Sequence, residues 1–105
     1  MEIVLIRGDH KPWGIDGRLY INRQRVCETV EHPRSHLPAG VHEVTLHFPF
    51  RHGDGALSST HGEIIVGKYA LPGVVTQSQA TYDRLYERLK KAWQRHTPIH
   101  LKIVG

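Results

Sequence analysis

Between residues 76 and 95, apolar residues recur at intervals of three and four, the spacing of one face of an α-helix. They are Tyr82, Leu85, Tyr86, Leu89, Ala92 and Trp93. The pattern predicts an amphipathic helix over residues 76–95, with Trp93 in the core. Thr76 and Gln79 have the spacing of a capping box at its start. An isolated helix of about this length is marginal in water, so we expect its apolar face to pack on the rest of the chain.

The other apolar positions alternate or form short runs, as in β-strands. They predict strands at 2–7, 18–22, 25–31, 41–48, 63–66 and 99–104, and loops at 8–17, 32–40 and 49–60. Asn22 suits a turn that joins the second and third strands into a hairpin. The predicted fold is a single α+β domain over residues 1–105. It has a mainly antiparallel sheet of about six strands, with barrel-like closure as one option, and one C-terminal amphipathic helix packed on it.

The composition indicates a soluble protein of the cytoplasm. Cys27 is the only cysteine, which excludes an internal disulfide and makes a reducing compartment the default. The four apolar residues after Glu2 do not form a signal peptide, and no run reaches membrane-spanning length. We therefore expect no membrane partner.

Positive charge is concentrated in the second half of the chain. Residues 1–60 are neutral, whereas residues 61–105 carry seven Lys and Arg against three Asp and Glu. Most of this excess lies on the predicted helix, at Arg84, Arg88, Lys90, Lys91 and Arg95. One interpretation is a weak nucleic-acid-binding surface. The absence of aromatic residues among these charges favours the other interpretation, a solvated face with cations near the helix C-terminus.

Several short segments, taken in order, resemble the uncharacterised bacterial and phage domain-of-unknown-function family 5675. They are 17–21 (GRLYI), 27–31 (CETVE), 37–41 (LPAGV) followed by 44–46, 62–67 (GEIIVG), 82–89 (YDRLYERL) and the closing strand 98–103. The resemblance covers nearly the whole chain. It implies an architecture rather than an activity, since the family has no settled function.

The resemblance also bears on catalysis. Longer members of that family carry a His segment and a Cys segment similar to those of the L,D-transpeptidases, which cross-link peptidoglycan through a cysteine thiolate. In this chain Glu63 follows His61 and Gly62 where that pattern has a cysteine. A carboxylate does not replace a thiolate in acyl transfer, so we expect no transpeptidation. Cys27 lies in a predicted strand, where it is expected to be a small buried hydrophobe.

Nine histidines make the chain histidine-rich, and metal binding is the chemistry to consider first. The densest polar group is His52 and Asp54 together with His61 and Glu63. On glycine-rich loops these side chains can converge on a divalent metal such as zinc. They can also serve acid–base catalysis, with His61 and Glu63 as candidate catalytic residues. Because no spacing matches a strong metal motif, histidines spread over the surface are the favoured interpretation.

Trp13 stands between Pro12 and Gly14 in a predicted loop. It is a candidate anchor for a partner, although burial as a plug over one end of the sheet is the favoured state. The function that we expect is a small non-catalytic binding or accessory domain of bacterial or phage type. Its partner would be a protein or cell-wall component, and homo-oligomers are compatible with the sequence. The alternatives are a small metal-dependent or acid–base hydrolase using the His52–Glu63 loop, and a weak nucleic-acid binder.

Overall fold

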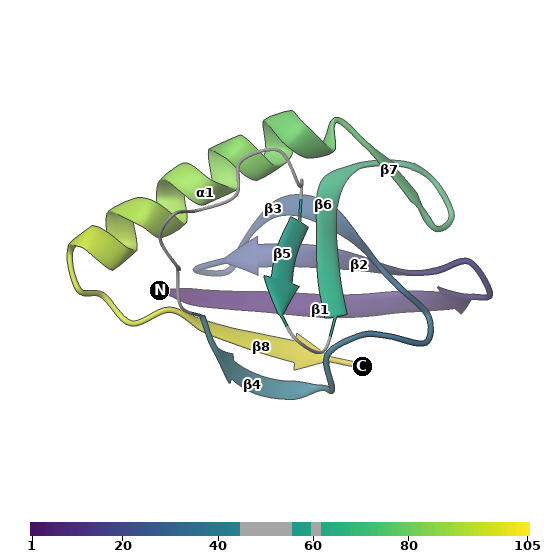
Figure 1. Ribbon diagram of the computed structural model, residues 1–105, viewed down its shortest axis with the longest axis horizontal. Coiled ribbons are helices and arrows are strands. Elements are labelled where there is room, and N and C mark those ends of the chain that lie inside the picture. Colours follow the sequence, from purple (N-terminus) through teal and green to yellow (C-terminus); the bar gives the residue numbers. More distant parts are fainter. Residues whose placement is uncertain (45–55, 60–61) are drawn as a thin grey trace.

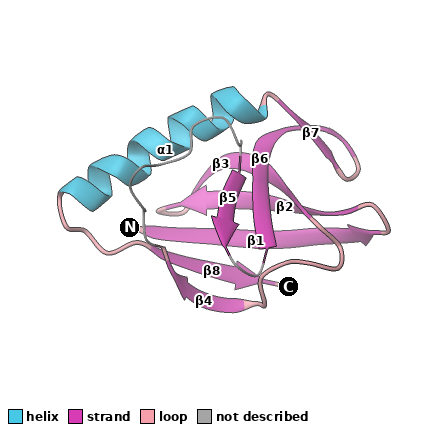
Figure 2. Ribbon diagram, in the orientation of Figure 1, coloured by secondary structure: helices cyan, strands magenta, loops and turns pink. Residues whose placement is uncertain are grey.

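The computed structural model describes residues 1–44, 56–59 and 62–105; for residues 56–59, 62 and 63 it describes the backbone alone. The described chain forms an α+β fold, as predicted, with one helix over a curved sheet (Figures 1 and 2). Its elements are β1 (Glu2–Lys11), β2 (Gly14–Ile21), β3 (Gln24–Glu31), β4 (Gly40–Glu43), β5 (Ala56–Ser59), β6 (Gly62–Leu71), β7 (Val74–Thr76), α1 (Ser78–Gln94) and β8 (His100–Val104).

The strands lie in the order β4-β8-β1-β2-β3-β6-β5, and β7 pairs with β6 outside this path. Every described pair is antiparallel except β1 with β8, which is parallel. The sheet is therefore mixed, and the prediction of about six strands was too low. Among the described strands, β4 and β5 end the path and do not pair with each other, so the sheet is open rather than a closed barrel.

β1 and β2 are both longer than the predicted strands 2–7 and 18–22, because most of the expected loop at 8–17 is strand. Gly17 was interpreted as a loop residue, but it lies within β2, where it is needed for close packing rather than for a turn. A Cβ at this position would lie 2.4 Å from Oγ1 of Thr29 and 2.8 Å from Cδ1 of Leu5. Glycine is thus the residue that fits between these neighbours, in the middle of a strand.

The predicted turn at Asn22 is confirmed. Asn22 and Arg23 both have positive φ, 49° and 71°, as a tight hairpin between twisted strands requires.

Three further strand predictions need correction. β6 continues to Leu71 and turns back into β7, whereas the sequence predicted a strand of 63–66 only. β5 lies inside the predicted loop 49–60, where pairing with β6 supplies its backbone partners. β4 ends at Glu43, and the rest of the predicted strand 41–48 lies largely outside the described residues.

The helix was predicted correctly, but its start was not. Thr76 ends β7 and pairs with Lys68, so it does not cap α1. Instead the N-cap is Gln77, which has a left-handed backbone (φ 54°) and no side-chain cap hydrogen bond. The amide of Gln79 donates to Oδ1 of Asp83 at 2.8 Å rather than reaching back. The capping-box prediction was therefore wrong.

α1 packs on the inner face of the sheet. Leu85 and Leu89 are buried there, as the helical pattern predicted. The cluster that they join is apolar and comprises Ile3, Leu5, Leu19, Ile21, Cys27, Ile64, Val66, Tyr82, Leu85, Tyr86, Leu89, Ala92, Ile99, Leu101 and Ile103. Trp93 does not belong to it and is 49% exposed, so its predicted burial was wrong. Trp93 is the second-to-last residue of α1, so the helix provides no further turn beside it.

In the part of the chain that the structure describes, no helix combines the length and apolar character needed to cross a membrane.

Candidate functional site

The predicted site on the His52–Glu63 loop lies largely outside the described residues. His52, Asp54 and His61 are outside them, and Glu63 is described only as backbone at the start of β6. The metal site and the acid–base site therefore remain predictions. Zinc calorimetry on protein without an affinity tag tests the metal site, because a genuine site loses stoichiometric binding in His52→Ala and in His61→Ala.

Three of the described histidines make local contacts with the backbone. A ring nitrogen of His36 lies 2.9 Å from the carbonyl oxygen of His32, and one of His42 lies 2.8 Å from that of Pro38. Nδ1 of His32 accepts the backbone N–H of Arg34 at 3.1 Å. Within residues 1–44 and 64–105, no three His, Cys, Asp or Glu side chains are grouped so that they could hold a metal ion.

Cys27 is buried in the apolar cluster, as predicted. Burial is the main cause that raises the pKa of its thiol from 9.0 to about 11, and the nearby charge of Glu28 adds to the effect. The reactive form of cysteine is the thiolate, which is scarce at neutral pH when the pKa is this high. Cys27 is thus poorly suited to act as a nucleophile.

Arg7 and Glu31 form a buried ion pair that sequence analysis missed. Nε of Arg7 donates to one carboxylate oxygen of Glu31 at 2.9 Å, and Nη2 donates to the other at 2.8 Å. Nη2 also donates to the carbonyl oxygen of Leu37. Their side chains are 3% and 0% exposed, so the pair is sealed from solvent and has a structural role.

One signal could have revealed this pair. Because side chains alternate along a strand, Arg7 shares the inner face with Ile3 and Leu5. On β3 the same alternation places Glu31 on one face with Cys27 and Thr29.

Trp13 is held in place at the turn between β1 and β2, yet most of its side chain is in solvent. It is 61% exposed, so the favoured prediction of burial as a plug was wrong. Its indole Nε1–H donates to the carbonyl oxygen of Pro72 at 2.8 Å. The ring lies against Gly73, where a Cβ would come within 2.3 Å of two indole atoms. The side chain is therefore ordered before any partner arrives.

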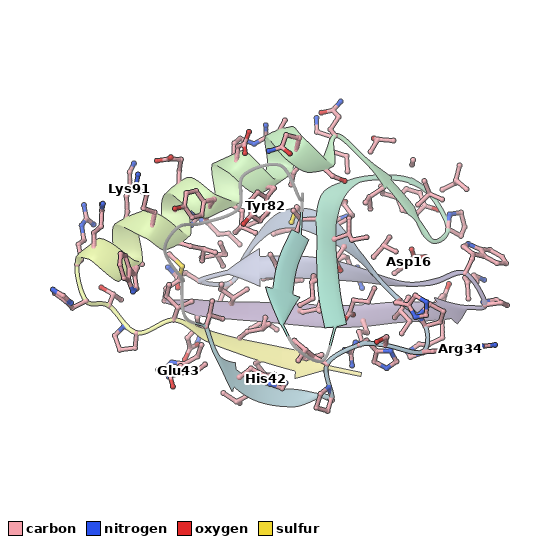
Figure 3. The ribbon with its side chains drawn as sticks, in the orientation of Figure 1. Asp16, Arg34, His42, Glu43, Tyr82 and Lys91 are labelled. Carbon is pink, nitrogen blue, oxygen red and sulfur yellow. The ribbon has the colours of Figure 1, made fainter. Side chains whose placement is uncertain are left out.

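A second bond joins the β6–β7 turn to strand β2. The backbone N–H of Gly73 donates to Oδ1 of Asp16 at 2.7 Å. Figure 3 shows Asp16 beside the β6–β7 hairpin. Gly73 has a φ of 78°, which an L side chain rarely adopts. Together these features fix the β6–β7 turn against the β1–β2 turn.

Exposed apolar residues stand next in sequence to Pro72 and Gly73, the two residues that the indole contacts. Leu71 and Val74, which immediately flank Pro72 and Gly73, pair across the β6–β7 hairpin. They are 54% and 39% exposed. We call Trp13, Leu71 and Val74 the Trp13 patch. Tyr69, further along the same hairpin, is also exposed.

No protein-family model, curated protein or solved structure matches this chain. The resemblance to family 5675 therefore remains a prediction carried by its motifs, and functional arguments must come from the side chains themselves.

Proposed function

We propose that this chain is a non-catalytic binding domain that docks on a protein partner through the Trp13 patch. The observation that supports this most directly is an exposed tryptophan whose position is already fixed by a hydrogen bond to Pro72. Tryptophan is prominent among residues that dominate binding energy at interfaces. Pre-ordering lowers the entropy lost on association, because the side chain gives up little further freedom.

The chemistry of the Trp13 patch limits what the partner presents. The indole N–H is occupied by Pro72, so the ring offers its apolar surface rather than a donor. Leu71 and Val74 add exposed aliphatic surface on the hairpin that holds the ring. The complementary partner surface is an apolar pocket or groove, in which the ring is desolvated on binding.

The experiment compares two tryptophans of similar exposure. Trp13→Ala and Trp93→Ala each remove one half-exposed indole, and only the first lies in the patch. Immobilised wild-type, Trp13→Ala and Trp93→Ala proteins are used to capture partners from the source cell, and the affinity of each captured protein is then measured by calorimetry. We expect Trp13→Ala to weaken binding at least about 30-fold, which corresponds to a hot-spot loss of about 2 kcal/mol.

Two controls make the comparison interpretable. Urea unfolding checks that Trp13→Ala remains folded, since the substitution also removes the hydrogen bond to Pro72. In a Trp93→Phe background, the fluorescence of Trp13 should shift to shorter wavelength when the partner binds. Equal affinity of the wild type and Trp13→Ala for every captured partner contradicts the proposal.

A further inference from the structure

The most concentrated charge on the described surface is a row of cations along α1. Arg84, Arg88, Lys91 and Arg95 are all exposed. Successive helical residues turn by about 100°, so these four positions fall within an arc of about 60°. They also span about 16 Å along the axis, at about 1.5 Å per residue. We call these four residues the cationic stripe.

No cation of this stripe forms an ion pair with a described residue. Within the described residues, ion pairs form only between Arg7 and Glu31 and between Arg25 and Glu28. On the helix itself, Asp83 receives a hydrogen bond from Gln79, and Glu87 borders the stripe on one side. Figure 3 shows Lys91 on the side of α1 away from the sheet and Tyr82 on the side that faces it. The four cations are thus exposed and unpaired among the described residues, which leaves them able to contact a large anionic partner.

From this geometry we propose that the cationic stripe binds the phosphate backbone of a nucleic-acid duplex without reading its sequence. A duplex presents about one negative charge per 1.7 Å of axis, so a length that matches the stripe carries enough phosphates to meet all four cations. Three of the four are arginines, whose planar guanidinium groups bind phosphate through two parallel hydrogen bonds.

The surroundings of the stripe argue against two other anionic partners. A helix that lies on a membrane inserts its apolar face, but the apolar face of α1 is buried against the sheet. A single strand needs aromatic rings on which its bases stack. Trp93 is the exposed aromatic residue of α1, and at 100° per residue it lies on the opposite side of the helix from the stripe.

The test measures binding of a fluorescent 20-base-pair DNA duplex by anisotropy between 50 and 200 mM salt. If all four cations contact phosphate, the plot of log affinity against log salt has a slope of about −3.6. Arg84→Glu with Arg88→Glu should lower the affinity at least tenfold at low salt and make the slope shallower. Arg84→Gln with Arg88→Gln should act in the same direction with a smaller effect.

The matched control is Arg18→Glu with Lys102→Glu. It makes the same change in net charge, at exposed positions of the sheet rather than of α1. We expect it to bind like the wild type, and Trp13→Ala to do so as well. Circular dichroism confirms that each variant is folded.

Four results overturn the proposal: no binding of the wild type at 50 mM salt, equal losses in the stripe variant and its control, equal affinity for poly-glutamate, or tighter binding to anionic vesicles than to the duplex. A duplex RNA of the same length separates a general backbone contact from one restricted to DNA. Equal affinity for both supports a contact made to phosphate alone.

Discussion

The inner face of the sheet has two halves that differ in character. In the apolar half, Ile3 and Leu5 of β1 pack in the cluster beneath α1. Two residues further along the same strand, Arg7 begins the ion-pair half, where it binds Glu31 of β3. Since alternation places all of these side chains on one face, the halves must differ in what covers them.

The covering segments explain the difference. An α-helix satisfies its own backbone hydrogen bonds, so α1 can present apolar side chains to the sheet. An irregular segment has carbonyl groups that need partners when they are buried. Leu37 belongs to such a segment, between β3 and β4, and its carbonyl oxygen accepts a hydrogen bond from Arg7. A sheet face covered by a loop thus requires a polar group, and this group in turn requires a buried counter-charge.

Removing one member of the ion pair should have the largest effect on stability. Glu31→Ala leaves the Arg7 guanidinium buried without its carboxylate, and we expect the free energy of unfolding to fall by about 3–5 kcal/mol. Urea denaturation gives this quantity. Glu28→Ala is the matched control on the same strand. It breaks a more exposed pair with Arg25, which contributes about 0–1 kcal/mol.

The double variant Arg7→Met with Glu31→Leu sharpens the comparison. Apolar side chains of similar volume often replace a buried ion pair without loss. If the Leu37 carbonyl truly requires a donor, this variant remains less stable than the wild type. If the double variant has the same free energy of unfolding as the wild type, our explanation of the ion-pair half is contradicted.

The apolar half is tested by a leucine at its centre. Leu89 is completely buried, and Leu89→Ala should cost about 2–5 kcal/mol, because it removes apolar contacts and leaves a cavity. Leu71→Ala makes the same chemical change in the Trp13 patch, where we expect a loss of about 0.5 kcal/mol or less. Similar losses in both variants would mean that α1 does not hold the core in the way described.

Gly17 lies at the boundary between the halves, paired with Arg7 on one side and Thr29 on the other. Gly17→Ala forces a Cβ to within 2.4 Å of Oγ1 of Thr29, so we expect a loss of about 1–3 kcal/mol in urea denaturation. Gly8→Ala is its control, because the nearest atom to a Cβ there is 3.7 Å away. If Gly17→Ala is as harmless as Gly8→Ala, the close packing across β2 is not real.

These elements show which features the sequence could predict. The period of α1 identified the helix to within two residues, because it depends on neighbours three and four positions away. The start of β2 was predicted too late because Gly17 was interpreted as a loop residue, although its role depends on Thr29 in another strand. The parallel pairing of β1 with β8 joins opposite ends of the chain, and no local pattern encodes it.

The candidate sites also divide into features set by residues near in sequence, which could be predicted, and features set by distant residues, which could not. The position of Trp13 depends on Pro72, 59 residues away, so the sequence suggested an anchor but favoured burial. The cationic stripe was visible in the helical period, since its members are neighbours on one element. The same period predicted that these cations lie on the solvated face, and Lys91 does lie on the side of α1 away from the sheet.

The last prediction concerns Cys27 in the apolar half, where the effect at neutral pH is smallest. Its thiol has a pKa raised to about 11 in the folded protein from an ordinary value of 9.0. A raised pKa stabilises the fold fully below the unfolded value, and this contribution is lost as the pH rises from about 9 toward 11. The difference in unfolding free energy between the wild type and Cys27→Ala should therefore be constant up to about pH 8 and then decrease. This comparison isolates the thiol, because lysines and tyrosines titrate equally in both proteins. Iodoacetamide at pH 8 gives an independent measurement: labelling of the native protein should be much slower than labelling in urea. Equal labelling rates would show that solvent reaches the thiol, and the apolar half would then be less well sealed than the ion-pair half.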